Sequence, residues 1–476
     1  MRAQSAIDRA VTAIVTTVTV AAGVFAPGHL GELTQIVPFE LVDGVLEQAR
    51  AREQRLRLLP SRVGVYFVLA LGLFPRAGYL GVWAKLTAAL GWLGLAAPSA
   101  KALRDLRRRV GAAPLQALFE VLAGPVAWPR TPGVAFGRYR TVAFDGCKSL
   151  KVPDTPRNRG WLGKMKASLG ETGYPVISLM TLCETGTRAL IGAAFGSTAD
   201  GEITWARRLL HRLDGSMLVL LDRGFDGGTF LAEVAATRAQ FLVRLTSARR
   251  PPVLRHLPDG SFTSLIGGVQ VRVIAAQVTV TCHDGTSYGD RYRLATTLTD
   301  WRAYPAQALI ALYHERWEHE VAYLSLRHTL LEGRVLRSGD PEGLRQELWA
   351  LLALYQALRI AVTDAVQTVP GTDPDRASYH IAVQTAADLV TGARNVTAAA
   401  TPAGDIGRAV LASLHGPRRP PVCPRRIKSP LSRWNKHPPG KPRQHKRVTS
   451  ITATISREYQ QPATHRRRSV TNAGGP

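Results

Sequence analysis

The middle of the chain constrains the fold most, because short apolar runs alternate there with helical segments in a definite order. Strands are expected where apolar residues stand together over a few positions, and helices where they recur every three or four positions. The expected strands are YRTVAFD (139–145), PVISLMTLC (175–183), ALIGAAF (189–195), MLVLLD (217–222) and residues 241–245, and the expected helices span 203–213 and 227–238. Three strands followed by helix, strand, helix and strand predict an α/β domain.

Changes in composition and periodicity divide the chain into regions. A chain of 476 residues is too long for one core, because single cores stop growing at roughly 250 to 300 residues. The order of elements above resembles a ribonuclease-H-like fold, which we expect in two parts separated by an insertion. The expected regions are a helical N-terminal, DNA-binding domain at 1–130, the first part of the core at 138–246, a β-rich insertion at 247–300, the second part of the core with its completing helices at 301–400, and a basic, disordered tail at 416–476.

The charge of the chain points to a polyanionic partner. Lys and Arg number 61 against 35 acidic residues, so the net charge is +26 and the chain would repel itself without counter-charge. From Pro417 onward there are 15 Lys or Arg and one acidic residue, Glu458, with few apolar residues. These numbers predict DNA as the partner and leave the tail without a fold of its own.

Membrane and secreted classes are disfavoured. The cysteines, which show neither a CxxC pair nor a regular spacing, are Cys147, Cys183, Cys282 and Cys423. They indicate no disulfide framework and no zinc site, which suits a reducing cytoplasm. Ala10 to Ala26 resembles a signal peptide, but threonines interrupt it and foldable sequence follows. Val63 to Phe74 is shorter than the roughly 20 residues that a membrane helix needs, so it predicts a buried helix. We therefore expect a cytoplasmic, nucleoid-associated bacterial protein without a membrane span.

A basic helix near residue 100 is a candidate DNA reader. It follows Pro98 and Ser99 and carries Lys101, Arg104, Arg107, Arg108 and Arg109. After a turn at 94–98, such a helix suits a helix-turn-helix in which Lys101, Arg104, Arg107 and Arg108 contact DNA. A solvated basic face on a packing helix explains the same residues equally well.

Two aspartates stand where expected strands end. Asp145 and Asp222 close apolar runs, and the ends of strands are where an α/β sheet exposes side chains to its active crevice. A shared metal site is one interpretation, and helix capping or loop hydrogen bonding is the other. Asp226, four residues after Asp222, is the rival for the second ligand position.

The expected long helix ALYHERWEHEVAYLSLRH (311–328) adds a third acid. At about 100° per residue, four of its polar side chains project within some 60° of one another. They are Tyr313, Arg316, Glu320 and Arg327. A carboxylate beside cations and a phenol suits a metal-bound phosphodiester, although an exposed face stitched by i,i+4 pairs also accounts for the spacing. The sequence HERWEH is not a zinc motif, because the position of its second histidine is occupied by Glu318.

These blocks together resemble the IS-four family of insertion-sequence transposases. The helix matches the family's Tyr-x2-Arg-x3-Glu-x6-Lys pattern, except that Arg327 replaces the lysine. FDGCKSLKVPDTPRN and LLDRGFDGGTF resemble the segments that carry the family's two aspartates, and residues 27–110 resemble its helical N-terminal domain. The resemblance spans about 27–360. It implies a DNA transposase of the DD-E type in which Asp145, Asp222 and Glu320 are catalytic.

The resemblance suggests a mechanism by two-metal phosphoryl transfer. Carboxylates suit hard Mg²⁺, with Mn²⁺ able to substitute, and we expect Asp145 to bridge two ions that Asp222 and Glu320 each complete. Tyr313, Arg316 and Arg327 then hold phosphates. The expected partners are the terminal inverted repeats of the element, target DNA and a second copy of the chain in a synaptic homodimer. A decayed or domesticated transposase that only binds DNA is the competing class.

Overall fold

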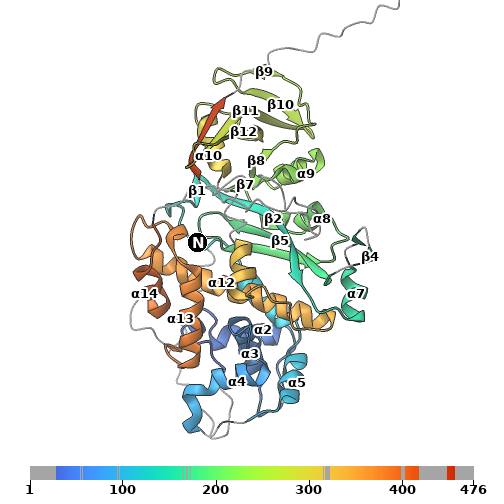
Figure 1. The fold of residues 1–476 in the computed structure, drawn as a ribbon, viewed down its shortest axis with the longest axis vertical. Helices are drawn as coiled ribbons and strands as arrows, with labels where there is room; N and C mark the ends of the chain where they lie inside the picture. The colour runs from blue at the N-terminus through green and yellow to red at the C-terminus, as the bar shows by residue number, and fades with distance from the viewer. Residues whose placement is uncertain are drawn as a thin grey trace, which may run out of the picture.

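The computed structural model describes residues 28–53, 55, 57–93, 95, 97–164, 166–167, 170–171, 173–314, 316, 322–397, 403–416 and 448–455. Within them, one large sheet runs through the molecule with helices on both of its faces (Figure 1). The expected mixed α/β class and the helical N-terminal region are confirmed. Ala10 to Ala26, Cys423, Glu320 and most of the tail lie outside the described residues.

The N-terminal region is helical because capping residues and glycines delimit its apolar segments. Its helices are α2 (Phe39–Gln48), α3 (Ser61–Leu73), α4 (Tyr79–Thr87), α5 (Ala100–Val110) and α6 (Ala113–Leu122), with short turns η1 (Leu33–Gln35) and η2 (Ala88–Leu93). Ser99 caps α5 by accepting from the Ala102 amide at 3.1 Å, and Gly111 ends it at a φ of 69°. The apolar run from Val63 forms α3, which is almost wholly buried, as expected.

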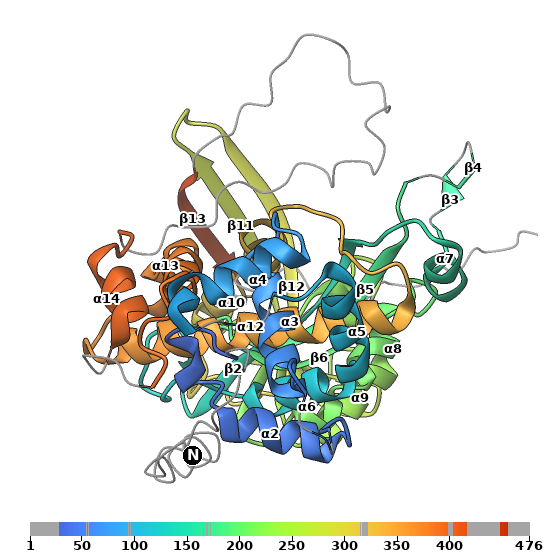
Figure 2. The same cartoon turned by 90° about the horizontal axis from the view of Figure 1, so that it is seen from below.

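The long helix α12 (Pro341–Gln367) joins this region to the rest of the molecule. Asp340 caps α12 by accepting from the Gly343 amide at 2.9 Å, and most of the helix is buried. Around it pack α2 to α6, α13 (Tyr379–Thr391) and α14 (Gly404–Ala412), all in one hydrophobic core (Figure 2). The residues before 130 therefore do not enclose a core of their own. Among the described helices, α12 is the one long and apolar enough to cross a membrane, but 89% of its apolar window is buried in this core.

The sheet has the order β6-β5-β2-β7-β8-β12-β11-β10-β9. Its strands are β2 (Tyr139–Lys151), β5 (Val176–Glu184), β6 (Leu190–Gly196), β7 (Met217–Leu221), β8 (Gln240–Arg244), β9 (Arg255–His256), β10 (Phe262–Ile266), β11 (Val269–Cys282) and β12 (Ser287–Thr296), and β1 (Ala135–Phe136) pairs with β2. The pairs β2–β7 and β7–β8 are parallel, and the other pairs are antiparallel. The strand-rich stretch after residue 247 thus extends the same sheet instead of forming a separate one.

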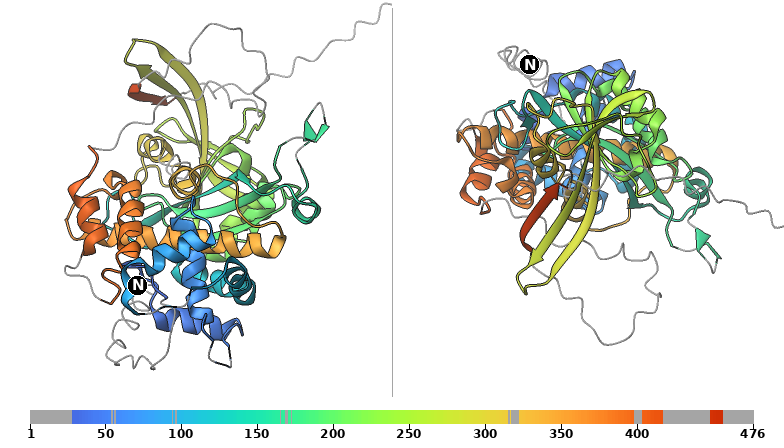
Figure 3. Two further views of the ribbon diagram at one scale, coloured as in Figure 1. Left: turned by 60° about the horizontal axis from the view of Figure 1, so that its bottom comes forward. Right: turned by 90° about the horizontal axis from the view of Figure 1, so that it is seen from above.

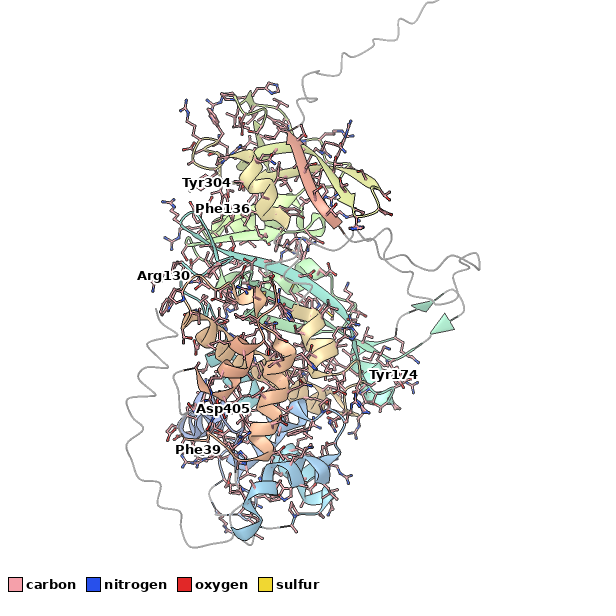
Figure 4. The ribbon with its side chains drawn as sticks, turned by 60° about the vertical axis from the view of Figure 1, so that its left-hand side comes forward. Phe39, Arg130, Phe136, Tyr174, Tyr304 and Asp405 are labelled. Atoms are coloured by element: carbon pink, nitrogen blue, oxygen red, sulfur yellow. The ribbon has the colours of Figure 1, made fainter. Side chains whose placement is uncertain are left out.

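Helices cover both faces of the sheet. On one face, α8 (Glu202–Arg207) and α9 (Gly228–Ala236) pack over β2, β5, β7 and β8. On the other, α10 (Ala306–His314) lies over β2, β7 and β8, and the helical layer around α12 covers β5 and the second half of β2. Tyr304, just before α10, stacks with Phe136 and Tyr139 at ring-centroid distances of 6.2 Å, which fastens this helix to the start of β2 (Figure 4).

Part of the tail that was predicted to be disordered forms a strand. β13 (Val448–Ile455) pairs antiparallel with the far half of β11, from Ala276↔Ile455 to Thr281↔Ser450. It lies beside the long β11–β12 hairpin where this projects from the body (Figure 3). The prediction is therefore wrong for 448–455. The segment VTSITATI alternates apolar and threonine residues and has no charge, so it can add to a sheet edge although its flanks are basic.

Candidate active site at the edge of the parallel strands

Asp145 and Asp222 come together at one edge of the sheet. β2 and β7 are adjacent and parallel, and their last paired residues are Ala143 and Leu220. Each aspartate stands two residues beyond its strand's last pair, so the register brings them level with each other. Both are half-buried. Carboxyl ends of parallel strands form the crevice of α/β sheets, which explains why two residues far apart in sequence meet here.

Local hydrogen bonds orient the two carboxylates. Asp145 Oδ1 accepts from the Gly146 amide at 2.9 Å, and Asp222 Oδ1 accepts from the Gly224 amide at 2.7 Å. Asp222 is also the N-cap of the short helix η4 (Arg223–Phe225). Capping, the alternative to metal binding, is therefore one of its roles, and it occupies one carboxylate oxygen.

Asp226 has a different environment. Its Oδ2 accepts from the amide and the hydroxyl of Thr246, both at 2.9 Å, and from Arg249 Nε at 3.2 Å. The carboxylate thus connects the turn after β7 to the loop after β8. Three donors on one oxygen give Asp226 a structural role and make it a poorer candidate ligand than Asp222.

The helix that was predicted to carry the third acid approaches both aspartates. Its first part, α10, ends at His314, and the chain is described again at Arg316 and from Ala322 onward, so Glu320 lies outside the described residues. On the near side of the gap, burial raises the pKa of Tyr313 to about 12, with Arg316 opposing the shift and Asp222 adding to it. On the far side, the Tyr323 hydroxyl donates to the backbone oxygen of Asp145 at 2.6 Å. The segment between Tyr313 and Tyr323 is therefore held between the two aspartates.

The far side of this helix departs from the regular α-helix that was expected. Residues Ser325–Leu330 form the π-helix η6, in which the Leu331 amide donates to Leu326 O, five residues back. The buried Arg359 of α12 donates to Ser325 Oγ at 3.1 Å where the widened turn begins. The angle computed for Arg327 from regular helical spacing is consequently wrong. Arg327 still reaches β2: burial raises the pKa of the Cys147 thiol, while the Ser149 hydrogen bond and the Arg327 charge oppose that rise.

Arg244 is a site residue that the sequence reasoning missed. It is the last residue of β8, and the register of β8 on β7, ending at Leu221↔Val243, puts it level with Asp222. Its guanidinium lies 4.0 Å from the ring centre of Tyr292, which in turn meets Tyr313 edge to face. The signal was readable: FLVR, like MLVLLD, is an apolar strand that ends in a charged residue.

The basic helix α5 presents only part of its charge. Lys101, Arg104 and Arg108 are exposed. Arg107 is only 6% exposed and donates to Gln346 Oε1 at 2.6 Å, to the Tyr79 hydroxyl at 2.9 Å and to Gly343 O at 2.7 Å. The prediction that Arg107 contacts DNA is therefore corrected, because its donors are used inside the protein.

The ligand chemistry at the sheet edge suits a hard divalent cation, since half-buried carboxylates are the preferred ligands of such ions. No group of three His, Cys, Asp or Glu side chains gathers among the described residues. Two of the three predicted acids, Asp145 and Asp222, stand together, and the third falls in the undescribed part of the helix.

Comparison with known proteins agrees with this site. The chain matches the family "Transposase DDE domain" over residues 137–356 and the family "Insertion element 4 transposase N-terminal" over residues 27–120. It is 25% identical over 350 residues, 71% of this chain and 78% of the relative, to the transposase InsG for insertion sequence element IS4 of Escherichia coli K12. It is 27% identical over 136 residues, 28% of this chain and 45% of the relative, to the putative transposase InsZ of the same organism.

A cryo-EM structure of the piggyBac transposase synaptic complex with hairpin DNA aligns over 83% of this chain and 88% of that chain, at 10% identity and a TM-score of 0.38. That likeness is too slight to support an inference. The fold, the paired aspartates and the matched catalytic domain define a DNA transposase with a DDE catalytic domain. Within that class, the N-terminal match and the relation to InsG identify the chain as a member of the IS-four family of insertion-sequence transposases.

Proposed function

We propose that Asp145, Asp222 and Glu320 hold the divalent ions, Mg²⁺ or Mn²⁺, with which this transposase cuts the ends of its element and joins them to target DNA. The observation that carries the proposal is the level placement of Asp145 and Asp222 on adjacent parallel strands, between the two ends of the Glu320 segment. The order β6-β5-β2-β7-β8 supports a ribonuclease-H-like core, in which three antiparallel strands are followed by two parallel ones.

The bound ions would supply activation of the attacking oxygen and stabilisation of the leaving oxygen in phosphoryl transfer. The protein's own residues would do the positioning. With its pKa raised to about 12, Tyr313 keeps its proton at physiological pH and can donate it to a phosphate oxygen. Arg316, Arg327 and Arg244 would hold neighbouring phosphates, because guanidinium donors match phosphate geometry.

DNA outside the cleavage site would meet other basic surfaces. The exposed Lys101, Arg104 and Arg108 of α5 are our candidates for contacts with the terminal inverted repeats. Salt-sensitive binding to phosphates would come from the basic tail. We also propose that a homodimer forms the synaptic complex and that the enzyme acts at the nucleoid.

Alanine replacement of the three acids tests the metal assignment. D145A, D222A and E320A should each abolish Mg²⁺-dependent cleavage of a labelled element end, while binding of that end in Ca²⁺ persists. Retained cleavage in any of the three would remove that residue from the proposed set. Wild-type protein that binds the end but never cleaves it in a single-turnover assay would instead indicate a decayed transposase that acts only as a DNA-binding protein.

A further inference from the structure

Tyr323 links the helix segment that follows Glu320 to the strand that ends in Asp145. Its hydroxyl lies 2.6 Å from Asp145 O, 3.0 Å from Thr181 Oγ1 and 3.5 Å from Leu179 O. Only 8% of Tyr323 is exposed, so water does not compete freely for these contacts. The hydroxyl therefore makes its hydrogen bonds inside the protein, directly behind the first aspartate.

The direction of the hydrogen bonds follows from the atoms involved. A backbone oxygen can only accept, so the Tyr323 proton points to Asp145 O, the nearest carbonyl. The tyrosine oxygen can then accept the proton of Thr181, whose residue is the β5 partner of Asp145 in the antiparallel register. The result is a short relay from Thr181 through Tyr323 to the backbone of Asp145.

This relay fixes the helix at the point where its position matters most. Glu320 precedes Tyr323 by three residues, so its Cα lies within about 11 Å of that of Tyr323. Tyr323 grips the backbone of Asp145, not its carboxylate, and leaves the carboxylate free to point into the crevice. A shift of the helix along β2 would change the separation of the two acids, and small misplacements in a catalytic site are costly.

We propose that Tyr323 is a positioning residue that sets the spacing between Asp145 and Glu320 and thereby the affinity of the site for its divalent ion. The inference rests on the proposed function of those two acids. It concerns the hydroxyl alone, because the ring is packed in the core whether or not the hydrogen bonds form.

The Tyr323→Phe substitution removes the hydroxyl and leaves the ring. The readout is Mn²⁺ binding to the full-length protein with an uncleaved element end, followed by the EPR signal of free Mn²⁺, together with the Mn²⁺ dependence of cleavage. The loss of one well-placed hydrogen bond corresponds to roughly a tenfold change in an equilibrium constant. We expect the Kd for Mn²⁺ to rise about tenfold in Y323F and by a smaller factor in Thr181→Val, which weakens the relay at its start.

Tyr66→Phe is the matched control. Tyr66 is fully buried in α3, and its hydroxyl donates to the backbone oxygen of Val37 at 2.7 Å, far from the sheet edge. Y66F should lower the thermal midpoint about as much as Y323F and leave the Kd for Mn²⁺ unchanged. An unchanged Mn²⁺ affinity in Y323F, or an equal change in Y66F, would overturn the inference.

The proposed function can fail separately. If D145A abolishes Mn²⁺ binding and cleavage while Y323F binds Mn²⁺ as the wild type does, only the role of Tyr323 is refuted. If D145A retains both, the metal assignment itself is wrong, and the role of Tyr323 falls with it.

Discussion

Two regions of this transposase are rich in charged side chains but use them in opposite ways. At the edge of β2, β7 and β8, Asp145 and Asp222 are half-buried, and each is oriented by an amide of its own turn. At the junction of α5 and α12, Arg107 is enclosed and uses its donors on the protein itself.

The difference shows how a charge that holds the fold can be told from a charge that can meet a ligand. A buried charge without partners is costly, so structural charges are surrounded by partners until their hydrogen-bonding capacity is used. Functional charges keep capacity in reserve and stand where a ligand can reach them. Asp226 belongs to the first kind and Asp222 to the second, although only four positions separate them in the sequence.

The sharpest way to break this comparison is to neutralise those two neighbours in turn. D222N should lower the rate of Mg²⁺-dependent end cleavage by about a thousandfold or more, because losing a metal ligand removes several kcal/mol of transition-state stabilisation. D226N keeps an oxygen that can accept from Thr246 and should cost at most about tenfold. Both are measured in single-turnover assays, with end binding in Ca²⁺ as the control. A larger loss in D226N than in D222N would reverse the assignment.

The next largest effect is expected at the junction. Arg107→Ala leaves the Gln346 and Glu347 side chains without their cation, so we expect the free energy of unfolding to fall by about 3 kcal/mol. Arg108→Ala, on the exposed face of the same helix, should change it by less than about 0.5 kcal/mol. Urea unfolding followed by circular dichroism measures both. If R107A unfolds like the wild type but binds element ends more weakly, Arg107 contacts DNA after all.

Arg244 tests whether the parallel edge extends to a third strand. Removing one donor that faces a transition-state phosphate is expected to cost about a hundredfold in cleavage rate in R244A, and R244K should recover part of it. Arg255, exposed in β9, is the matched control, and R255A should cleave within about twofold of the wild type. Equal rates in R244A and R255A would confine the site to β2, β7 and the Glu320 helix.

The smallest effect concerns the far edge of the sheet. Truncation after Ile455 removes four Lys or Arg residues and keeps β13, whereas truncation after Gly416 removes 15 and uncovers the edge of β11. Only the second should lower the free energy of unfolding, by about 1 kcal/mol, and increase self-association through the unpaired strand edge. It should also flatten the salt dependence of DNA binding more than the first. Urea unfolding, sedimentation and binding at several salt concentrations separate these effects, and identical stability of the two truncations would make β13 dispensable.

The local sequence was sufficient for much of this molecule. Apolar runs of strand length ending in Asp145 and Asp222, and the capped apolar segment of α3, fold as their patterns predict because burial and hydrogen bonding at those positions are settled by near neighbours. The same patterns, with the family resemblance, pointed to the transposase and its catalytic residues.

Other features depended on residues distant in the chain. Arg107 and Arg108 are adjacent and chemically identical, and only the packing of α5 against α12 decides which is enclosed. Likewise, Thr246 and Arg249 engage Asp226 and leave Asp222 available, the register of β8 brings Arg244 level with Asp222, and β11 offers an edge to the uncharged strand within the tail. The sequence by itself determined which side chains could do chemistry. The tertiary structure decided which of them still had capacity to do it, because that capacity depends on every donor and acceptor that the fold brings within hydrogen-bonding distance.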